Sequence, residues 1–260
     1  MPKLAANLTM MFNEVEFIER FIAAADAGFE GVEFLFPYGY DKNELSDKIN
    51  DLDLELVLHN LPAGDWDSGE RGIAALPGRE GEFQDSVGQA IEYACALGCK
   101  QLNCLSGIAP SSSDSDKMMS TLLQNLHFAS TALADNGIKL LIEPINTIDM
   151  PGIFLNTTTQ ALEIIAAVAS DNLWLQYDIY HMQIMEGDIT RSIEKHLDVI
   201  SHMQLADNPG RHEPGTGEIN YPFLFNSIDA MGYEGWIGCE YKPATGTIEG
   251  LGWTSDYLNS

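Results

Sequence analysis

Positively charged residues are scarce in this chain of 260 residues, which carries 13 Lys and Arg against 39 Asp and Glu and a formal net charge of −26. A nucleic-acid surface needs clustered cations that displace counterions from phosphates, and an anionic membrane attracts basic segments. The composition therefore argues against both partners, and we expect neither nucleic acid nor a membrane to bind. Because an acidic field also repels small anions at long range, a site for an anionic ligand has to be built locally, from a metal ion or one of the few arginines.

Long apolar segments are absent as well. No run of about 18 apolar residues occurs, so we expect no transmembrane helix. Residues 1–7 lack the hydrophobic region of a signal peptide. Together these absences predict a cytoplasmic protein, whose oligomeric state the sequence leaves open between a monomer and a homo-oligomer.

Cysteine is also rare, and no Cys-x-x-Cys pair occurs, which argues against a structural zinc site. The cysteines are Cys95, Cys99, Cys104 and Cys239. The first two are spaced to share a helix face or a helix end, and the other two lie in apolar strand-like runs. We therefore expect buried, reduced thiols. No Ser-His-Asp or reactive-cysteine arrangement indicates nucleophilic catalysis.

Apolar strand-like runs alternate with helical patterns throughout the chain. We expect strands at residues 4–12, 31–36, 54–59, 101–105, 139–146, 173–179, 202–205 and 236–241, with the pairing of the fifth strand ending at Pro144. We expect helices at residues 13–27, 41–52, 80–97, 114–134, 157–169, 190–199 and 221–231, and a polar loop and helix cap at residues 111–114.

Eight strands that alternate with helices predict an α/β fold with a parallel sheet. A chain of 260 residues has the typical length of a (β/α)8 barrel, so we expect one TIM-barrel domain over residues 1–260. No Gly-x-Gly-x-x-Gly motif follows the first strand, which lowers the case for a dinucleotide-binding fold. The loop at residues 60–77 is long for a compact domain, and such loops usually have a function.

Two glutamates occupy equivalent positions at the ends of expected strands. Glu143 follows a short apolar run and precedes Pro144, and Glu240 repeats this arrangement about a hundred residues later. A buried carboxylate is costly unless a cation, a proton or a hydrogen-bond donor meets it. In a closed barrel the carboxyl ends of all strands meet at one face, where active sites lie. With Asp178 and Gln204, from the two strands between them, the glutamates predict a half-ring of oxygen ligands that suits Mg²⁺ or Mn²⁺.

Two glutamates that flank one metal ion suggest a specific chemistry. The metal ion would polarise a carbonyl group and stabilise an enediolate. One glutamate would remove a proton, and the other would return a proton to the neighbouring carbon. This pattern predicts an aldose–ketose isomerase or an epimerase, and it leaves open which glutamate acts as the base.

Further candidates for substrate binding lie on the same side of the expected barrel. Arg71 belongs to the loop after the third strand, Arg211 to the loop after the seventh, and Lys242 follows the eighth. An arginine can bind a carboxylate through two parallel hydrogen bonds, with a salt bridge inside the loop as the alternative. His59 and His181, at or just past strand ends, could bind substrate oxygens or make structural hydrogen bonds.

Seven short motifs resemble the hydroxypyruvate isomerase family, within the xylose isomerase-like barrels. The resemblance covers essentially the whole chain, and as a set the motifs are specific. They are Ala-Ala-Asn-Leu at 5–8, Val-Glu-Phe-Leu-Phe-Pro-Tyr at 32–38, Gly-Glu-Arg-Gly at 69–72, Leu-Pro-Gly-Arg-Glu at 76–80, Arg-His-Glu-Pro at 211–214, Gly-Glu-Ile-Asn-Tyr at 217–221 and Gly-Trp-Ile-Gly-Cys-Glu-Tyr-Lys-Pro at 235–243.

This resemblance implies that Glu143 and Glu240 are the acid–base pair and that both bind a metal ion together with Asp178 and Gln204. Related sugar epimerases have a histidine at the position of Gln204. The implied reaction converts hydroxypyruvate to 2-hydroxy-3-oxopropanoate (tartronate semialdehyde), and the substrate is a small anionic hydroxy-keto acid. A close relative acts on 2-oxo-tetronates, and the loop at residues 60–66 resembles the hydroxypyruvate branch.

Other classes of protein share parts of this pattern. An abasic-site endonuclease barrel uses several metal ions and many histidine ligands, whereas this chain has 6 histidines and a net charge of −26. A non-catalytic binding barrel would not need two bases around one metal ion. Within the isomerases, a 2-oxo-tetronate isomerase or a related ketose epimerase is the alternative.

Overall fold

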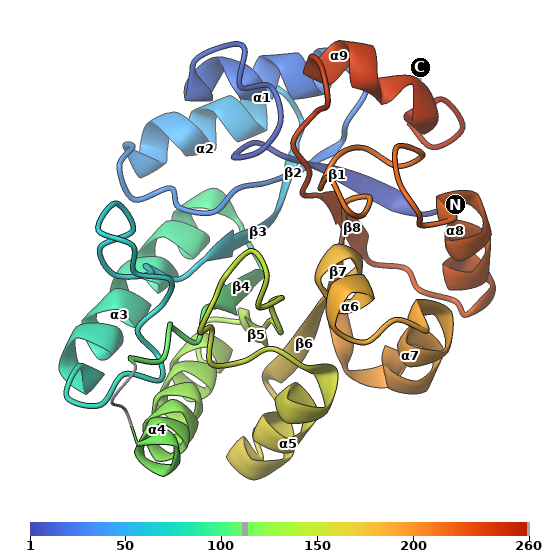
Figure 1. Ribbon diagram of the computed structural model, residues 1–260. Helices are drawn as coiled ribbons and strands as arrows, with labels where there is room; N and C mark the ends of the chain where they lie inside the picture. The colour runs from blue at the N-terminus through green and yellow to red at the C-terminus, as the bar shows by residue number, and fades with distance from the viewer. Residues whose placement is uncertain (111–113, 259–260) are drawn as a thin grey trace.

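Parallel strands form a closed barrel with helices around it in the computed structural model (Figure 1), which describes residues 1–110 and 114–258. The strands pair in chain order, and the last one pairs with the first. They are β1 (Lys3–Asn7), β2 (Gly31–Glu33), β3 (Glu55–Asn60), β4 (Gln101–Cys104), β5 (Lys139–Ile142), β6 (Leu173–Asp178), β7 (Ile200–Leu205) and β8 (Trp236–Cys239). The closed barrel confirms the predicted (β/α)8 fold.

Helices follow the strands and cover the outside of the barrel (Figure 1). They are α1 (Phe17–Asp26), α2 (Lys42–Asp51), α3 (Glu80–Leu97), α4 (Ser115–Ala134), α5 (Thr158–Val168), α6 (Ile179–Met185), α7 (Ile189–His196), α8 (Tyr221–Ala230) and α9 (Thr247–Gly250), with 3-10 turns η1 (Leu197–Val199) and η2 (Leu251–Thr254). Asp114 caps α4 as predicted, by accepting from two backbone N–H groups of its first turn. The rest of that predicted loop and cap, residues 111–113, lies outside the described residues.

Some strands are shorter than predicted, and α6 was not predicted. β1 ends at Asn7, whose Oδ1 accepts hydrogen bonds from the backbone N–H groups of Thr9 and Met10 and so turns the chain. At the end of β6, Oδ1 of Asp178 accepts from the backbone of Tyr180 and His181 and starts α6. Polar side chains that bond to the local backbone therefore end strands that the apolar pattern alone would continue.

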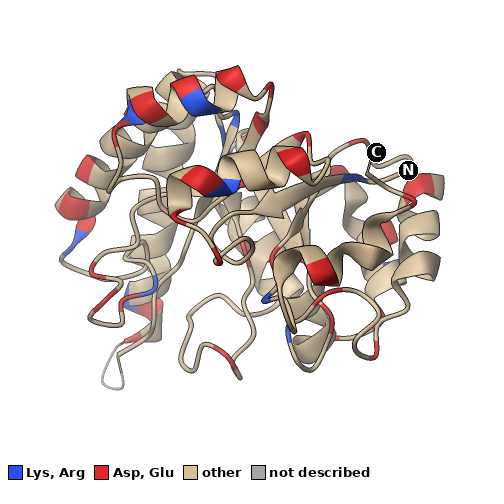
Figure 2. Ribbon diagram, turned by 90° about the horizontal axis from the view of Figure 1, so that it is seen from above, with Lys and Arg blue, Asp and Glu red and all other residues tan. Residues whose placement is uncertain are grey.

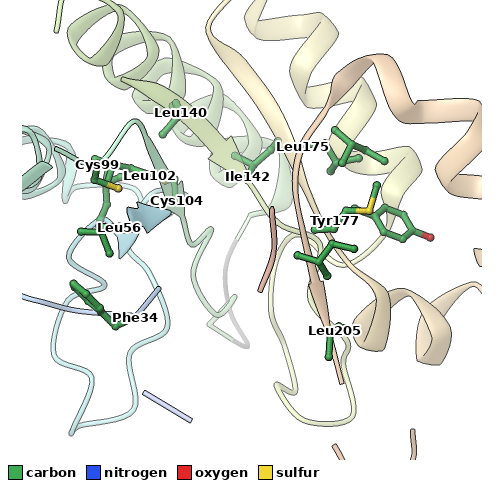
Figure 3. Packing of buried hydrophobic residues seen from close by; sticks show 14 of the residues in the cluster. Phe34, Leu56, Cys99, Leu102, Cys104, Leu140, Ile142, Leu175, Tyr177 and Leu205 are labelled. Carbon is green, nitrogen blue, oxygen red and sulfur yellow. The ribbon is translucent and has the colours of Figure 1, made fainter. Parts of the chain in front are cut away.

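The hydrophobic core lies mainly between the barrel and its helices. Figure 3 shows Leu102, Leu140 and Ile142 among the buried side chains of this layer. The prediction of four buried thiols is wrong for Cys95, which is exposed, whereas Cys99, Cys104 and Cys239 are buried. Cys95 lies on the solvent-facing side of α3. Because α3 ends at Leu97, Cys99 lies beyond the helix, and the spacing of four residues does not place the two thiols on one helix face.

Inside the barrel, a small apolar cluster of Ala5, Val57, Leu58 and Leu141 fills the amino-terminal half. Polar side chains occupy the carboxyl-terminal half, where the strands end. Acidic residues are spread over the outer helices and loops (Figure 2). None of the described helices is long and apolar enough to cross a membrane.

Candidate active site

A cavity of about 520 Å³ lies at the carboxyl ends of the strands. Its walls come from segments that are far apart in the sequence, because every strand of the barrel delivers its carboxyl end to this face. Six of the residues predicted for the site line it: Arg71, Glu143, His181, Arg211, Glu240 and Lys242. The closed barrel thus brings together the two glutamates that the sequence placed at equivalent strand ends.

A cluster of buried ionisable groups lies at this cavity, which Glu143, His181 and Glu240 line and Asp178 adjoins. Glu143, Asp178, His181 and Glu240 each place one potential ligand atom so that all four atoms lie within 4.8 Å of one another. Glu143 directly follows β5, Asp178 is the last residue of β6, and Glu240 directly follows β8. Such a group of carboxylates could hold a metal ion.

Asp178 supplies the clearest sign that a cation fits the cluster. Its Oδ1 accepts from the first turn of α6, at 2.7 Å from the N atom of Tyr180. Its Oδ2 is buried and has no hydrogen-bond partner among the described residues. A buried carboxylate oxygen without a donor is costly, so this atom is suited to bind a cation.

The electrostatics of the two glutamates agree with this conclusion. Burial raises the pKa of Glu143 well above its usual range, and the neighbouring charges of Glu240 and Asp178 raise it further. Burial also raises the pKa of Glu240, although Arg211 opposes the shift. Three carboxylates crowded into one buried space repel one another, and a divalent cation would relieve that repulsion.

Gln204, the remaining predicted ligand, takes part in a polar network inside the barrel. Its Nε2 donates to Oε1 of Glu33 at 2.7 Å, and its Oε1 accepts from Nε2 of Gln176 at 2.6 Å. Glu33 also pairs with Nε2 of His202 at 2.7 Å and accepts from Asn7 at 2.8 Å. Gln204 therefore lies on β7, between the strands that carry Asp178 and precede Glu240, but it does not line the cavity itself.

The three predicted cations of the cavity have different partners. Arg211 donates to Oε2 of Glu240 at 2.6 Å and lies 3.8 Å from Oδ2 of Asp149. Arg71 donates to the carbonyl of Trp66 at 2.9 Å, and its guanidinium stacks 3.9 Å from the centre of that ring. The exposed Lys242 lines the mouth. Arg71 and Lys242 therefore keep their charges available to a ligand, whereas Arg211 is already paired.

Comparison with known proteins places this architecture in a family. Residues 21–257 match the family model of the xylose isomerase-like TIM barrels. The chain belongs to this family.

Relatives within the xylose isomerase-like barrels match over their whole length. Hydroxypyruvate isomerase of Escherichia coli is 54% identical over 257 residues, which cover 99% of this chain and 100% of that protein. The 2-oxo-tetronate isomerase of Cupriavidus necator is 48% identical over 258 residues, with 99% of each chain covered. A crystal structure described as an AP endonuclease of family 2, from Brucella melitensis, superimposes with a TM-score of 0.98 at 48% identity and covers 100% of both chains.

His59 does not line the cavity of this xylose isomerase-like barrel, so of its two expected roles the structural hydrogen bond is the one that the geometry favours. A register shift between β2 and β3 pairs Val32 with Leu56 but Glu33 with Leu58, so β3 contains an extra residue. The bulge reverses the alternation of side chains beyond it. Asn60 consequently lines the cavity, and the ring of His59 packs outside it, against Phe34 and Tyr38.

Several residues in or beside the cavity were not assigned a role from the sequence. Nδ2 of Asn103 donates to Oε2 of Glu143 at 2.8 Å, and its place at the end of a predicted strand was the available signal. Asn146, Asp149 and Tyr180 form a hydrogen-bonded group beside His181. The sequence indicates these three residues only weakly. Asn146 and Asp149 lie in a loop without periodicity, although this loop closely follows Glu143, and Tyr180 lies on the unpredicted helix α6.

Proposed function

We propose that this protein is an isomerase that interconverts hydroxypyruvate and 2-hydroxy-3-oxopropanoate (tartronate semialdehyde). The observation that carries the proposal is the pair of buried glutamates, Glu143 and Glu240, which both line the cavity and belong to one carboxylate cluster. The full-length relative from Escherichia coli, a hydroxypyruvate isomerase, supports the choice of substrate.

The reaction requires two proton transfers at neighbouring carbons. A proton leaves C3 of hydroxypyruvate, a proton is delivered to C2, and the hydroxyl proton moves from the oxygen on C3 to the oxygen on C2. One of the two glutamates takes the first proton and the other gives the second. Without a bound cation, burial raises the pKa of both carboxyl groups, so each holds a proton more readily than a carboxyl group in water.

The residues that are present fit a divalent cation, Mg²⁺ or Mn²⁺. We assign it to the carboxylates of Glu143, Asp178 and Glu240, oxygen ligands of the kind these ions prefer. Gln204, predicted as a fourth ligand, could join them only by releasing the hydrogen bond that its amide oxygen accepts from Gln176. When bound, the ion would supply positive charge that polarises the substrate carbonyl. Asn103 holds one oxygen of Glu143 in place for the proton transfer through its hydrogen bond of 2.8 Å.

The carboxylate of the substrate needs its own cationic partner. Arg71, Arg211 and Lys242 line the cavity, in a chain with only 13 Lys and Arg. Because Arg211 is paired with Glu240, we assign the substrate carboxylate chiefly to Arg71, whose guanidinium is held in place by Trp66. This local arrangement overcomes the repulsion that an acidic chain exerts on an anion.

A 2-oxo-tetronate isomerase is the second candidate. It is favoured by the relative from Cupriavidus necator, which is 48% identical over nearly the whole chain. The same proton transfers would serve a substrate with one more carbon, and a cavity of about 520 Å³ has room for it. The abasic-site endonuclease alternative finds no support in the charges, because the net charge of −26 opposes DNA binding.

Proton exchange in D₂O tests the proposal. Protein supplied with Mg²⁺ or Mn²⁺ is incubated with hydroxypyruvate and, separately, with a 2-oxo-tetronate, and NMR follows deuterium incorporation and product. We expect exchange and product with hydroxypyruvate, and faster turnover with it than with the tetronate. Absence of exchange with both substrates would refute the isomerase proposal, and faster turnover of the tetronate would select the second candidate.

Two variants assign the proton transfers. Glu143→Gln and Glu240→Gln should each lower turnover by about 10²–10⁴-fold, because each loses a group that moves a proton. Glu163→Gln, at an exposed position of α5, is the matched control and should retain full activity. A Glu143 or Glu240 variant with a near-normal rate would remove that residue from the proton-transfer pair.

A further inference from the structure

The side chain of Asn146 has a defined orientation. Its Oδ1 accepts hydrogen bonds from the backbone N–H of Ile148 at 3.0 Å and from the backbone N–H of Asp149 at 2.7 Å. Its Nδ2 donates to Oδ2 of Asp149 at 3.2 Å. A rotated amide would place an NH₂ group against two N–H donors and an oxygen against a carboxylate, so the surrounding groups determine which atom is nitrogen.

This orientation determines the hydrogen-bonding role of His181. Nδ2 of Asn146 also lies 2.7 Å from Nδ1 of His181. Because the amide NH₂ group can only donate, Nδ1 of the ring has to accept this hydrogen bond. A neutral imidazole has one donor and one acceptor nitrogen, so its proton is then on Nε2. A doubly protonated ring would place the hydrogen on Nδ1 against the amide NH₂ group, so the same contact requires a neutral ring.

The protonated Nε2 atom faces the carboxylate cluster. It lies 3.5 Å from Oδ2 of Asp178 and 3.8 Å from Oε1 of Glu143. A metal ion needs a nitrogen lone pair, which a protonated Nε2 does not offer. By distance alone His181 belongs to the group that could hold a metal ion, but its tautomer makes it a hydrogen-bond donor.

We propose that Asn146 is a positioning residue that fixes His181 in the tautomer with the proton on Nε2, so that His181 donates a hydrogen bond into the cavity and is not a metal ligand. The consequence for catalysis rests on the proposed isomerase function. During that reaction negative charge develops on a substrate oxygen, and a neutral, rigidly held N–H donor stabilises it without releasing its own proton.

Nitrogen NMR of histidine-labelled protein tests the tautomer directly. In metal-free protein we expect Nε2 of His181 to carry the proton and Nδ1 to be unprotonated, with the signals assigned by comparison with His181→Gln. After addition of Mg²⁺ alone, the Nε2 proton should persist. A ring with its proton on Nδ1, or loss of the Nε2 proton when Mg²⁺ binds, would overturn the inference whether or not the protein turns over hydroxypyruvate.

The variant Asn146→Asp isolates the role of the amide. An aspartate can still accept from the backbone N–H groups of residues 148 and 149, but it replaces the donor that faces the ring with an acceptor. We expect Nδ1 of His181 to become protonated and kcat for hydroxypyruvate to fall about 10–100-fold, the effect of losing one strong hydrogen bond, with a smaller change in KM. Ile148→Asp, on the same turn, adds the same charge at a side chain that is 74% exposed, and it should leave tautomer and kcat unchanged.

The outcomes separate the two proposals. If Asn146→Asp keeps the proton on Nε2, or moves it without lowering kcat, Asn146 does not act through the tautomer. If the parent protein shows the expected tautomer but exchanges no proton on hydroxypyruvate, the isomerase proposal fails while the assignment of His181 as a donor stands.

Discussion

Nη2 of Arg211 lies 2.6 Å from Oε2 of Glu240, so a guanidinium from the loop after β7 holds the carboxylate that follows β8. The same guanidinium lies 5.1 Å from the ring centre of Tyr180. Arg211 has a φ of 55°, a left-handed conformation that is unfavourable for a side chain of this size. A strained residue that contacts a proposed proton-transfer group is typical of a functional site.

Replacement of Arg211 by methionine should impair the proposed reaction. A hydrogen bond between charged groups contributes about 1.5–3 kcal/mol, so we expect kcat/KM for hydroxypyruvate to fall about 10–150-fold. Arg191→Met is the control, because Arg191 is 82% exposed and pairs only with Asp188 in its own turn among the described contacts. Equal rates for both variants would show that the contact between Arg211 and Glu240 has no part in turnover.

Metal binding should depend on the oxygen of Asp178 that has no donor. Mn²⁺ at about 100 times its Kd should add about 2.7 kcal/mol to the free energy of unfolding. Asp178→Asn should lose most of this gain yet remain folded, because its Oδ1 can still cap α6. Asp41→Asn alters a similar cap on α2, away from the site, and should keep the gain. Calorimetric titration and thermal unfolding measure both quantities, and an unchanged Mn²⁺ affinity in Asp178→Asn would contradict the assigned ligand set.

Gly238 should be intolerant of any side chain. A Cβ atom there would collide with both carboxylate oxygens of Glu33, the partner of Gln204. We expect Gly238→Ala to destabilise the protein by about 1–3 kcal/mol, as overpacking does in other interiors. Gly88→Ala, on the exposed side of α3 with no atom within 4 Å of the added carbon, should instead stabilise by about 0.5–1 kcal/mol. Urea unfolding compares the two, and a neutral Gly238→Ala would show that Glu33 can move.

His59 should make the protein sensitive to acid. Burial lowers its pKa from 6.5 to about 4 in the folded chain. Above pH 6.5 the ring is neutral in both the folded and the unfolded chain, and the folded chain keeps its full stability. As the pH falls from 6.5 through 4, stability is lost, because the unfolded chain binds a proton that the folded chain resists. The loss amounts to about 3 kcal/mol.

The measurement is the difference in unfolding free energy between parent and His59→Asn, followed from pH 7.5 to 4. This difference should shrink as the pH falls, since the variant lacks the titrating ring. His127→Asn, at an exposed position on α4, controls for the loss of a histidine as such. A difference that stays constant with pH would contradict the depressed pKa of His59.

The barrel and its two glutamates could be predicted because they depend on local patterns. Apolar runs define the strands, and a closed parallel barrel gathers whatever follows them, so Glu143 and Glu240 had to meet. Tyr180 and Asp149 could not be predicted in this way. Their contact joins a loop to α6, a helix that begins only because Asp178 caps it.

His59 illustrates a second limit of sequence patterns. It was a candidate because it lies at a strand end, but a strand-end position does not say which way the side chain points, and the extra residue in β3 reverses the alternation. Val57 and Leu58 both reach the interior of the barrel, yet consecutive apolar residues in a buried strand do not reveal which of them is the bulge. The position of the bulge is set by pairing with β2, whose residues are distant in the sequence.

The pairing of β8 with β1 also affects the order of events during synthesis. Leu4 pairs with Ile237, and Glu240 lies just beyond this last strand. Until the ribosome has released β8, the first strand has only β2 beside it, and Glu143 and Asp178 lack the second glutamate. The carboxylate cluster is therefore completed only by the step that closes the barrel, so a nascent chain stalled before β8 should have neither the proposed cation site nor the second proposed proton-transfer group.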